Sequence, residues 1–261
     1  MISITSVQLS AWLALFIFPF VRILAMIASS PILGNKQVPA RVKIGLAVML
    51  TVIIAPTLTV QPNVEPASAM GFFVLLQQIL AGLAMGFTMR LIFTAVEMAG
   101  DIIGMQMGLG FAIFYDPLNA SYTPVVAQFL GLLAALIFLS IDGHLYMLSA
   151  LADSFHTFPI SSAAPSAVAL HTLAAWGGSI FTHALQLSLP LLGALLITNL
   201  ALGILTRAAP QLNLFAVGFP ITLAIGFTTL MLSLPYLAPQ LNRFIHVGLG
   251  TAQTIMQQLG K

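Results

Sequence analysis

Gly108-Leu-Gly-Phe-Ala-Ile-Phe-Tyr-Asp-Pro117 is the stretch that decides the fold of this chain. It lies between long apolar runs of helical length, yet its two glycines and its Asp-Pro pair suit the interior of a lipid-facing helix poorly. Irregular backbone at membrane depth is tolerated only where it is buried in protein or lines an aqueous path. The stretch therefore predicts a segment that acts on an aqueous passage through the protein, rather than a further membrane-anchoring helix.

The composition is that of a membrane protein. Of the 261 residues, 59% are hydrophobic and 5% are charged, and the mean hydropathy is +1.06. A soluble domain carries about 25% charged residues. The net charge of +2 gives no basic surface for nucleic acid, so none is expected as a partner. The absence of cysteine excludes disulfides, thiolate metal sites and cysteine nucleophiles.

The apolar runs predict an all-helical membrane fold. One straight span needs about 20 residues, so the chain has material for roughly five to seven helices. The runs are too long for the strands of a barrel and do not alternate. A final stretch, Leu241 to Leu259, has apolar residues at helical spacing and predicts a separate amphipathic helix. The runs lie near 7–33, 44–60, 70–95, 124–141, 145–159, 173–206 and 212–238.

Simple counting of spans leads to a conflict. Lys36, Arg41 and Lys43 place the first loop in the cytoplasm by the positive-inside rule. Three full spans between 124 and 206 would then carry Arg207 to the opposite side. One re-entrant hairpin over 124–159 removes the conflict, because 145–159 is short for a full crossing.

Two sets of glycines suggest close helix packing. Gly82 and Gly86 form one small-residue motif, and Gly100 and Gly104 continue to Gly108 as a longer stripe along one helix face. Such stripes let the backbones of membrane helices approach closely. The longer stripe leads directly into the glycine-rich stretch. This arrangement suggests that close helix packing holds the adjoining irregular segment in a defined conformation.

Polar and charged residues inside or beside the apolar runs are candidate structural positions. An amide or guanidinium in hydrocarbon needs a protein or water partner, so these residues indicate either ordinary helix-helix hydrogen bonds or contacts within a larger assembly. Glu97 and Asp101, four residues apart, could bind a cation or relay protons, but a solvated or partner-facing stripe is the more ordinary interpretation. The remaining members of this group are Arg22, Arg90, Asn199 and Arg207.

The aromatic side chains of the glycine-rich stretch are candidates for obstructing a conduit. Bulky rings on a flexible glycine base can block a channel and swing aside, and apolar constrictions exclude water. No histidine or nucleophile nearby completes a catalytic set, and the five dispersed histidines lack metal-binding spacing, so neither catalysis nor a bound metal is expected. Asp before Pro commonly begins a turn. The candidate residues are Gly108, Gly110, Phe111, Phe114, Tyr115, Asp116 and Pro117.

Together these stretches resemble the FliR family of flagellar export-gate proteins, called SctT in injectisomes. The matching stretches occur in the same order as in that family along nearly the whole chain. Their residues are more similar to the flagellar branch than to the injectisome branch. It rests on Phe18–Arg22, Ser30–Gly34, Val38–Lys43, Glu97–Gly108, Gly110–Pro117, Asp142–Tyr146, Ser154–Pro159, Asn199–Gly203, Arg207–Leu212 and Gly218–Pro220.

The resemblance implies an all-α, membrane-associated fold within a helical hetero-oligomer. Residues 1–170 would form FliP-like helical hairpins with an irregular plug loop at about 106–122, and residues 171–261 a FliQ-like hairpin with the amphipathic helix. The implied partners are FliP and FliQ in the gate, FlhB around it and FlhA at its base. Unfolded flagellar polypeptides would pass through, without catalysis or cofactor, across the bacterial inner membrane at the flagellar basal body, in an assembly raised toward the periplasm.

Two other classes of function remain open from the residues alone. A small-solute secondary transporter would also have broken helices with polar groups near the membrane centre, but it should show inverted repeats and a buried charged site. Neither is evident in the sequence. An intramembrane enzyme would have only Glu97, Asp101 and scattered histidines to support it.

Overall fold

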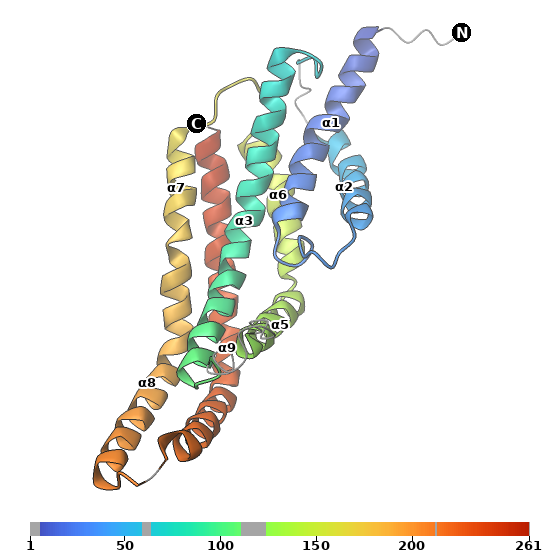
Figure 1. The fold of residues 1–261 in the computed structure, drawn as a ribbon. Coiled ribbons are helices and arrows are strands. Elements are labelled where there is room, and N and C mark those ends of the chain that lie inside the picture. Colours follow the sequence, from blue (N-terminus) through green and yellow to red (C-terminus); the bar gives the residue numbers. More distant parts are fainter. Residues whose placement is uncertain (1–5, 59–63, 111–123, 212, 261) are drawn as a thin grey trace. The chain divides into compact units, whose positions relative to one another are not determined.

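The computed structural model describes residues 6–58, 64–110, 124–211 and 213–260. Every regular element in these ranges is a helix, which confirms the all-helical prediction (Figure 1). The helices are α1 (Ser6–Ser29), α2 (Ala40–Ile54), the 3-10 turn η1 (Ala55–Thr57), α3 (Ala69–Gln106), α5 (Val125–Ser140), α6 (Gly143–Thr157), α7 (Ala167–Gly177), α8 (Ser179–Ala208) and α9 (Leu214–Leu259).

Five helical stretches in the described ranges are long and apolar enough to cross a membrane. The pair α5 and α6, separated by Ile141 and Asp142, would add a sixth if it forms one broken span, and a re-entrant loop is the other arrangement that this pair allows. The count agrees with the five to seven helices expected. The five stretches are Gln8–Ser29, Ala40–Thr57, Ala69–Gln106, Ala167–Ala208 and Ala216–Leu259.

The chain divides into two compact units, and each unit draws on distant parts of the sequence. Unit 1 holds Met1–Leu91, Asp142–Gly178 and Ile245–Lys261, and unit 2 holds Ile92–Ile141 and Ser179–Phe244. This division does not test the boundary expected at 170/171. That boundary came from likeness to two other proteins, whereas these units group helices by their packing.

Unit 1 is built around α1. Helix α2 lies beside it, after the loop that the Gly, Pro and Asn residues of 34–39 predict (Figure 1). Lys43 stabilises this loop by donating from Nζ to the carbonyl oxygens of Gly34 and Asn35, each at 3.0 Å. The first part of α3 packs on α1, and Trp176 of α7 donates from Nε1 to the carbonyl of Thr88 in α3 at 3.1 Å.

Unit 2 packs on small side chains. Ala95 and Ala99 of α3 are fully buried against Ala184 of α8. Phe93 of α3 and Phe138 of α5 meet edge to face, with ring centroids 5.5 Å apart. Small residues let helix axes approach closely, and aromatic pairs at this distance add stabilisation beyond the area that they bury.

Helix α9 differs from its predicted form. Helix α9 runs without interruption from Leu214 to Leu259 through three prolines, so the amphipathic piece after Leu241 is its continuation and not a separate helix. Membrane helices tolerate proline because neighbouring groups satisfy the freed carbonyls. Asp142 occupies the N-cap position of α6 with φ 57°, and its side chain makes no capping hydrogen bond.

Candidate functional site: a buried arginine and the end of helix α3

The first candidate site is a fully buried guanidinium in unit 1. Arg22 of α1 is 0% exposed and donates from Nε to Gln78 Oε1 of α3 at 2.8 Å. Its Nη1 donates to the carbonyl and the hydroxyl of Ser154 at 2.9 and 3.1 Å, and its Nη2 donates to the carbonyl of Phe158 at 2.8 Å. The guanidinium also lies over the ring of Phe155, 4.2 Å from its centroid.

This cluster joins three helices at one point. Ser154 belongs to the last turn of α6 and Phe158 follows that helix directly, so the cation of Arg22 meets the negative end of the α6 dipole. None of the partners just named is a carboxylate. The positive charge is balanced by carbonyl dipoles, an amide, a hydroxyl and aromatic faces. The arrangement can fix the positions of α1, α3 and α6, but it contains no group that performs acid–base or nucleophilic chemistry.

The second candidate site is the C-terminal end of α3 in unit 2. Gly108 has φ 86°, a left-handed conformation that favours glycine. Its N–H donates to the carbonyl of Met105 at 3.0 Å, and the N–H of Leu109 donates to the carbonyl of Gly104 at 3.0 Å. This pair of bonds is a Schellman motif, which ends a helix and satisfies its last carbonyls. Gly108 is therefore a helix cap, and the predicted helical stripe through Gly100 and Gly104 ends before it.

Helix α9 contacts this helix end through a second pair of residues. Met107 is 0% exposed, and its carbonyl accepts a hydrogen bond from Thr222 Oγ1 at 3.2 Å. The same hydroxyl lies 3.0 Å from the carbonyl of Phe219 in its own helix, so its one proton has two acceptors within reach. One turn further along α9, a methyl group on Gly226 would lie 2.6–2.9 Å from Met107 Cγ, Sδ and Cε. With any larger residue at position 226, the Met107 side chain would have to shift.

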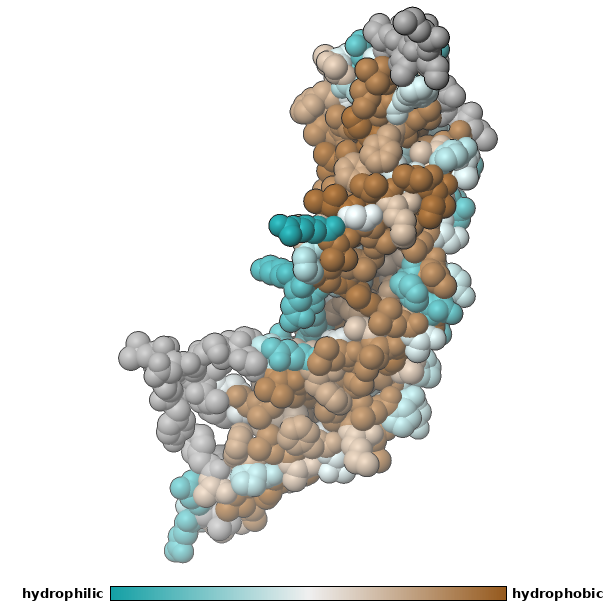
Figure 2. Space-filling view, turned by 90° about the vertical axis from the view of Figure 1, so that its right-hand side faces the viewer, coloured by the Kyte–Doolittle hydropathy of each residue, from teal (hydrophilic) through white to brown (hydrophobic). Residues whose placement is uncertain are grey.

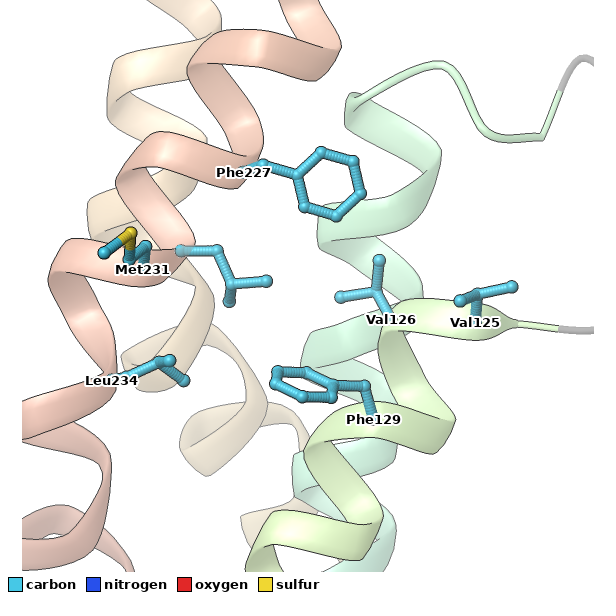
Figure 3. Close-up of a pocket in the computed structure, with 7 residues that line it drawn as sticks. Val125, Val126, Phe129, Phe227, Met231 and Leu234 are labelled. Atoms are coloured by element: carbon cyan, nitrogen blue, oxygen red, sulfur yellow. The ribbon is translucent and has the colours of Figure 1, made fainter.

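An apolar pocket of about 310 Å³ lies in unit 2 between α5 and α9 (Figure 3). It begins at the first residue of α5, two positions after the segment 111–123. Its described lining is entirely apolar, so these residues can accept an apolar group but cannot coordinate an ion. Its lining residues are Val125, Val126, Phe129, Phe227, Leu230, Met231 and Leu234.

The four remaining glycines of the two stripes lie at helix contacts. Positions for a Cβ on Gly82 and Gly86 are blocked by α1, the first by the carbonyl oxygen of Arg22 and the second by Ser29 Oγ. A Cβ on Gly100 would overlap the backbone of α5, while one on Gly104 would make ordinary contact with Val126 of α5.

The other predicted polar positions lie on α3 and α8. Arg90 and Glu97 are exposed on α3, and Asp101 is half-buried one turn after Glu97. On α8, Asn199 is exposed, and Arg207 is exposed in the last turn, where a cation favours the helix dipole.

Most of the predicted plug lies outside the described residues. Of the seven candidates, the structure describes Gly108 and Gly110. The residues that fall outside are Phe111, Phe114, Tyr115, Asp116 and Pro117.

Several residues at the two sites were not predicted. Gln78 and Phe158 complete the shell of Arg22, and Thr222 and Gly226 enclose Met107. The position of Gln78 inside the apolar run 70–95 was a sequence signal of a buried polar contact. Thr222 and Gly226 gave no such signal, because threonine and glycine are common in membrane helices.

These features define a class of protein: a multi-helix membrane protein with a built polar cluster, no catalytic set in the described ranges and long helices that keep much apolar surface uncovered. A sequence profile for bacterial export proteins, family 1, matches residues 13–247. The chain belongs to this family, which confirms the resemblance to FliR proteins.

Individual relatives cover nearly the whole chain. The flagellar biosynthetic protein FliR of Pectobacterium carotovorum subsp. carotovorum is 48% identical over 240 residues, which is 92% of this chain and 91% of the relative. The protein of the same name from Escherichia coli strain K12 is 46% identical over 239 residues, with the same two coverages. The Bacillus subtilis strain 168 protein of that name is 29% identical over 248 residues, 94% of this chain and 95% of its own length.

Proposed function

We propose that this chain is a non-catalytic core subunit of the flagellar type III secretion export gate. It forms with FliP and FliQ the channel through which unfolded flagellar polypeptides cross the bacterial inner membrane. Residues 1–170 take the FliP-like part and residues 171–261 the FliQ-like part. The loop at about 106–122 plugs the closed channel, FlhB surrounds the gate and FlhA lies at its base. Membership of the bacterial export family and the names of the relatives support this proposal.

The observation that carries the proposal is the match of the chain to bacterial export proteins over most of its length. On α9, exposed large apolar side chains extend from Val217 to Tyr236, about 29 Å of helix at 1.5 Å per residue. This length is that of the hydrocarbon core of a bilayer, about 30 Å. Beyond Tyr236 the exposed side chains include Gln240, Arg243 and His246, which favour a polar or protein environment for the last part of the helix.

Helix α8 supports the proposal through its exposed surface. In the apolar stretch that it completes, Ala167–Ala208, only 22% of an apolar segment of 18 residues is buried within the chain. Exposed apolar surface is not confined to this stretch, since Figure 2, which views the molecule from the side of α1 and α2, shows apolar side chains, in brown, over much of the face that it draws. Asn199 is exposed on α8 between Leu196 and Leu200, which are also exposed. A primary amide facing hydrocarbon lacks a hydrogen-bond partner, whereas a neighbouring helix can supply one.

The proposal is tested by assembly and by permeability. Tagged full-length chain, expressed with FliP and FliQ in a flagellated host, should co-purify with both proteins. Shortening the segment 106–122 should leave this assembly intact and increase the passage of ions or small dyes across the membrane. If the shortened variant supports export with unchanged permeability, the plug assignment is wrong.

A small-solute transporter remains the second function class, and purification separates it from the first. A transporter should be stable alone or as a small homo-oligomer in detergent. A gate subunit should depend on its partners, since its long apolar helices are poorly covered without them. Stable, solute-binding preparations of the chain alone would favour the transporter.

A further inference from the structure

We infer that the exposed face of α2, together with Lys36 and Arg41, binds an anionic phospholipid of the membrane. The phosphate of the headgroup lies against the two cations, and an acyl chain lies along the helix. The inference goes beyond the export channel, because it concerns recognition of lipid by the outer surface of unit 1. All the residues that carry it belong to this unit and are described.

Basic charge in the first part of the chain has no acidic counterpart there. Residues 1–64 contain four basic residues, and the first acidic residue of the chain is Glu65. Arg22 is one of the four, and it is fully buried in the cluster described above. The other three lie within eight consecutive positions, from Lys36 to Lys43. A surface of one sign attracts a partner of the opposite sign, so this end of unit 1 favours an anion.

Two of these three cations are available to a ligand. Lys43 is half-buried, and its Nζ donates to carbonyl oxygens of the preceding loop. Lys36 and Arg41 are exposed, and within the described residues neither has a hydrogen bond or an ion pair. Their charges are therefore balanced only by what lies outside the chain.

Lys43 also brings the two available cations to the same end of α2. Its Nζ lies 3.0 Å from the carbonyl oxygens of both Gly34 and Asn35, so it ties the loop to the first turn of the helix. Lys36 follows the tied Asn35 directly, and Arg41 is the second residue of that first turn. One headgroup can therefore contact both cations.

The position of Arg41 is unfavourable for the helix by itself. The first turn of α2 has no acidic residue, and Pro39 at the N-cap supplies no capping side chain. A cation at this end is repelled by the positive end of the helix dipole. A phosphate beside Arg41 offsets both positive charges, whereas a neutral ligand offsets neither. The location of this arginine therefore favours an anionic headgroup.

Beyond Arg41, the exposed face of α2 is apolar. Arg41, Gly45, Val48 and Val52 are exposed and follow one another at helical spacing. A Cβ on Gly45 would meet nothing within 4 Å, so the space one turn after Arg41 is open. The opposite side of α2 carries the buried residues and contacts α1 (Figure 1). The exposed large apolar side chains of the helix are Val42, Ile44, Val48, Met49, Val52 and Ile53.

The length of this face matches one leaflet of a bilayer. From Arg41 to Ile53 the helix rises about 18 Å at 1.5 Å per residue. One leaflet contributes about 15 Å, half of a hydrocarbon core about 30 Å thick. A cation at one end and apolar side chains over the length of an acyl chain are the features that a phospholipid fits. A protein partner finds no hydrogen-bonding side chain along this face except Arg41. The predicted cytoplasmic location of the loop agrees, because the cytoplasmic leaflet carries anionic lipid.

The test uses the full-length chain, with the proteins that co-purify with it, in phosphatidylcholine vesicles. A trace of phosphatidylglycerol with a photoreactive acyl chain labels the residues that it contacts, and mass spectrometry of peptides locates the label. Unlabelled phosphatidylglycerol with the same acyl chains is then added in increasing proportion. The proportion that halves the labelling measures the preference for the anionic headgroup, and soluble glycerol phosphate is the competitor that lacks acyl chains.

We expect labelling within Arg41–Ile53 that phosphatidylglycerol displaces and glycerol phosphate does not. Lys36→Gln and Arg41→Gln should each weaken the preference roughly fivefold, the effect of one cation near an anionic surface. Arg41→Lys keeps the charge and should retain the preference. The matched control is Arg243→Gln, which removes an exposed cation from α9 and should change nothing. In detergent without anionic lipid, all these variants should be as stable as the unmodified chain, because the replaced side chains are exposed.

Three results would overturn the inference. Labelling of α2 that phosphatidylglycerol and phosphatidylcholine displace equally would show that the headgroup is not recognised. A preference unchanged in the double variant, Lys36→Gln with Arg41→Gln, would show that these cations do not bind it. Label on other helices but none on α2 would show that a protein subunit covers this face. High salt tests the unmodified chain in the same assay, since it screens exposed charges and should reduce the preference; an unchanged preference would also reject the site.

Discussion

Replacing Arg22 with methionine should destabilise unit 1 by about 2.5–8 kcal/mol. Methionine fills much of the same volume, so the loss is that of the donors and the charge. Gln78 Oε1 and the carbonyl of Phe158 would lose the donor that the structure gives them, at about 1–3 kcal/mol each. Ser154 loses less, because its carbonyl keeps the N–H of Phe158 at 2.9 Å. The contact with the Phe155 ring adds roughly 0.5–2 kcal/mol.

Lysine at the same position should be intermediate, at about 1–3 kcal/mol. Its ammonium retains the charge near the end of α6, but it lacks the planar fork that reaches Gln78, Ser154 and Phe158 together. A double variant, Arg22→Met with Gln78→Leu, should be less destabilised than the sum of its single changes. The leucine removes the orphaned Gln78 Oε1 and also Nε2, which is buried without a hydrogen-bond partner in the described part of the chain.

The assay is unfolding of the purified complex by SDS in mixed micelles, followed by circular dichroism, with the cellular level of the chain as a second measure. Arg41→Met is the matched control, because it removes the same charge from an exposed position in unit 1 and should change stability by less than about 0.5 kcal/mol. If Arg22→Met is as stable as this control, the guanidinium does not hold the three helices together, and the reasoning from orphaned acceptors is wrong.

Three smaller predictions concern single contacts. Gly82→Ala should destabilise unit 1 by about 1–3 kcal/mol because its Cβ would meet the backbone of α1, whereas Gly193→Ala, with nothing within 4 Å, should be neutral or slightly stabilising in the same unfolding assay. Trp176→Phe should cost about 0.5–1.5 kcal/mol, the value of its hydrogen bond to Thr88. Asn199→Leu should lower co-purification with partner subunits roughly three- to tenfold, and an unchanged yield would indicate that this amide contacts no partner helix.

The sequence predicted the helical class, the approximate number of spans and the first loop, because each depends on local composition. Long apolar runs and a Gly-Asn-Pro loop are read from neighbouring residues alone. The end of α3 was harder to predict from the sequence. Gly108 could continue a glycine stripe or cap a helix, and only the positive φ and the bonds to Met105 and Gly104 decide for the cap.

Helix α9 shows a different limit. Pro220, Pro235 and Pro239 each argue locally for a break, yet the helix continues through all three. The cost of proline in a helix is a lost hydrogen bond and a steric conflict in the preceding turn, and packing against other helices can outweigh it. Sequence periodicity carries no measure of that packing, so the prediction of a separate terminal helix failed.

The two candidate sites share a physical origin that a local pattern does not reveal. Every helix end leaves carbonyls without intrahelical partners, and in a protein this apolar there is little water or polar side chain to satisfy them. Here the end of α6 is satisfied by Arg22 and the end of α3 by Thr222, each from another helix. Because only 5% of residues are charged, a donor at such a position has few substitutes nearby. Buried donors at helix ends should therefore tolerate substitution less than exposed polar residues such as Arg41, whatever the function of the surrounding helices.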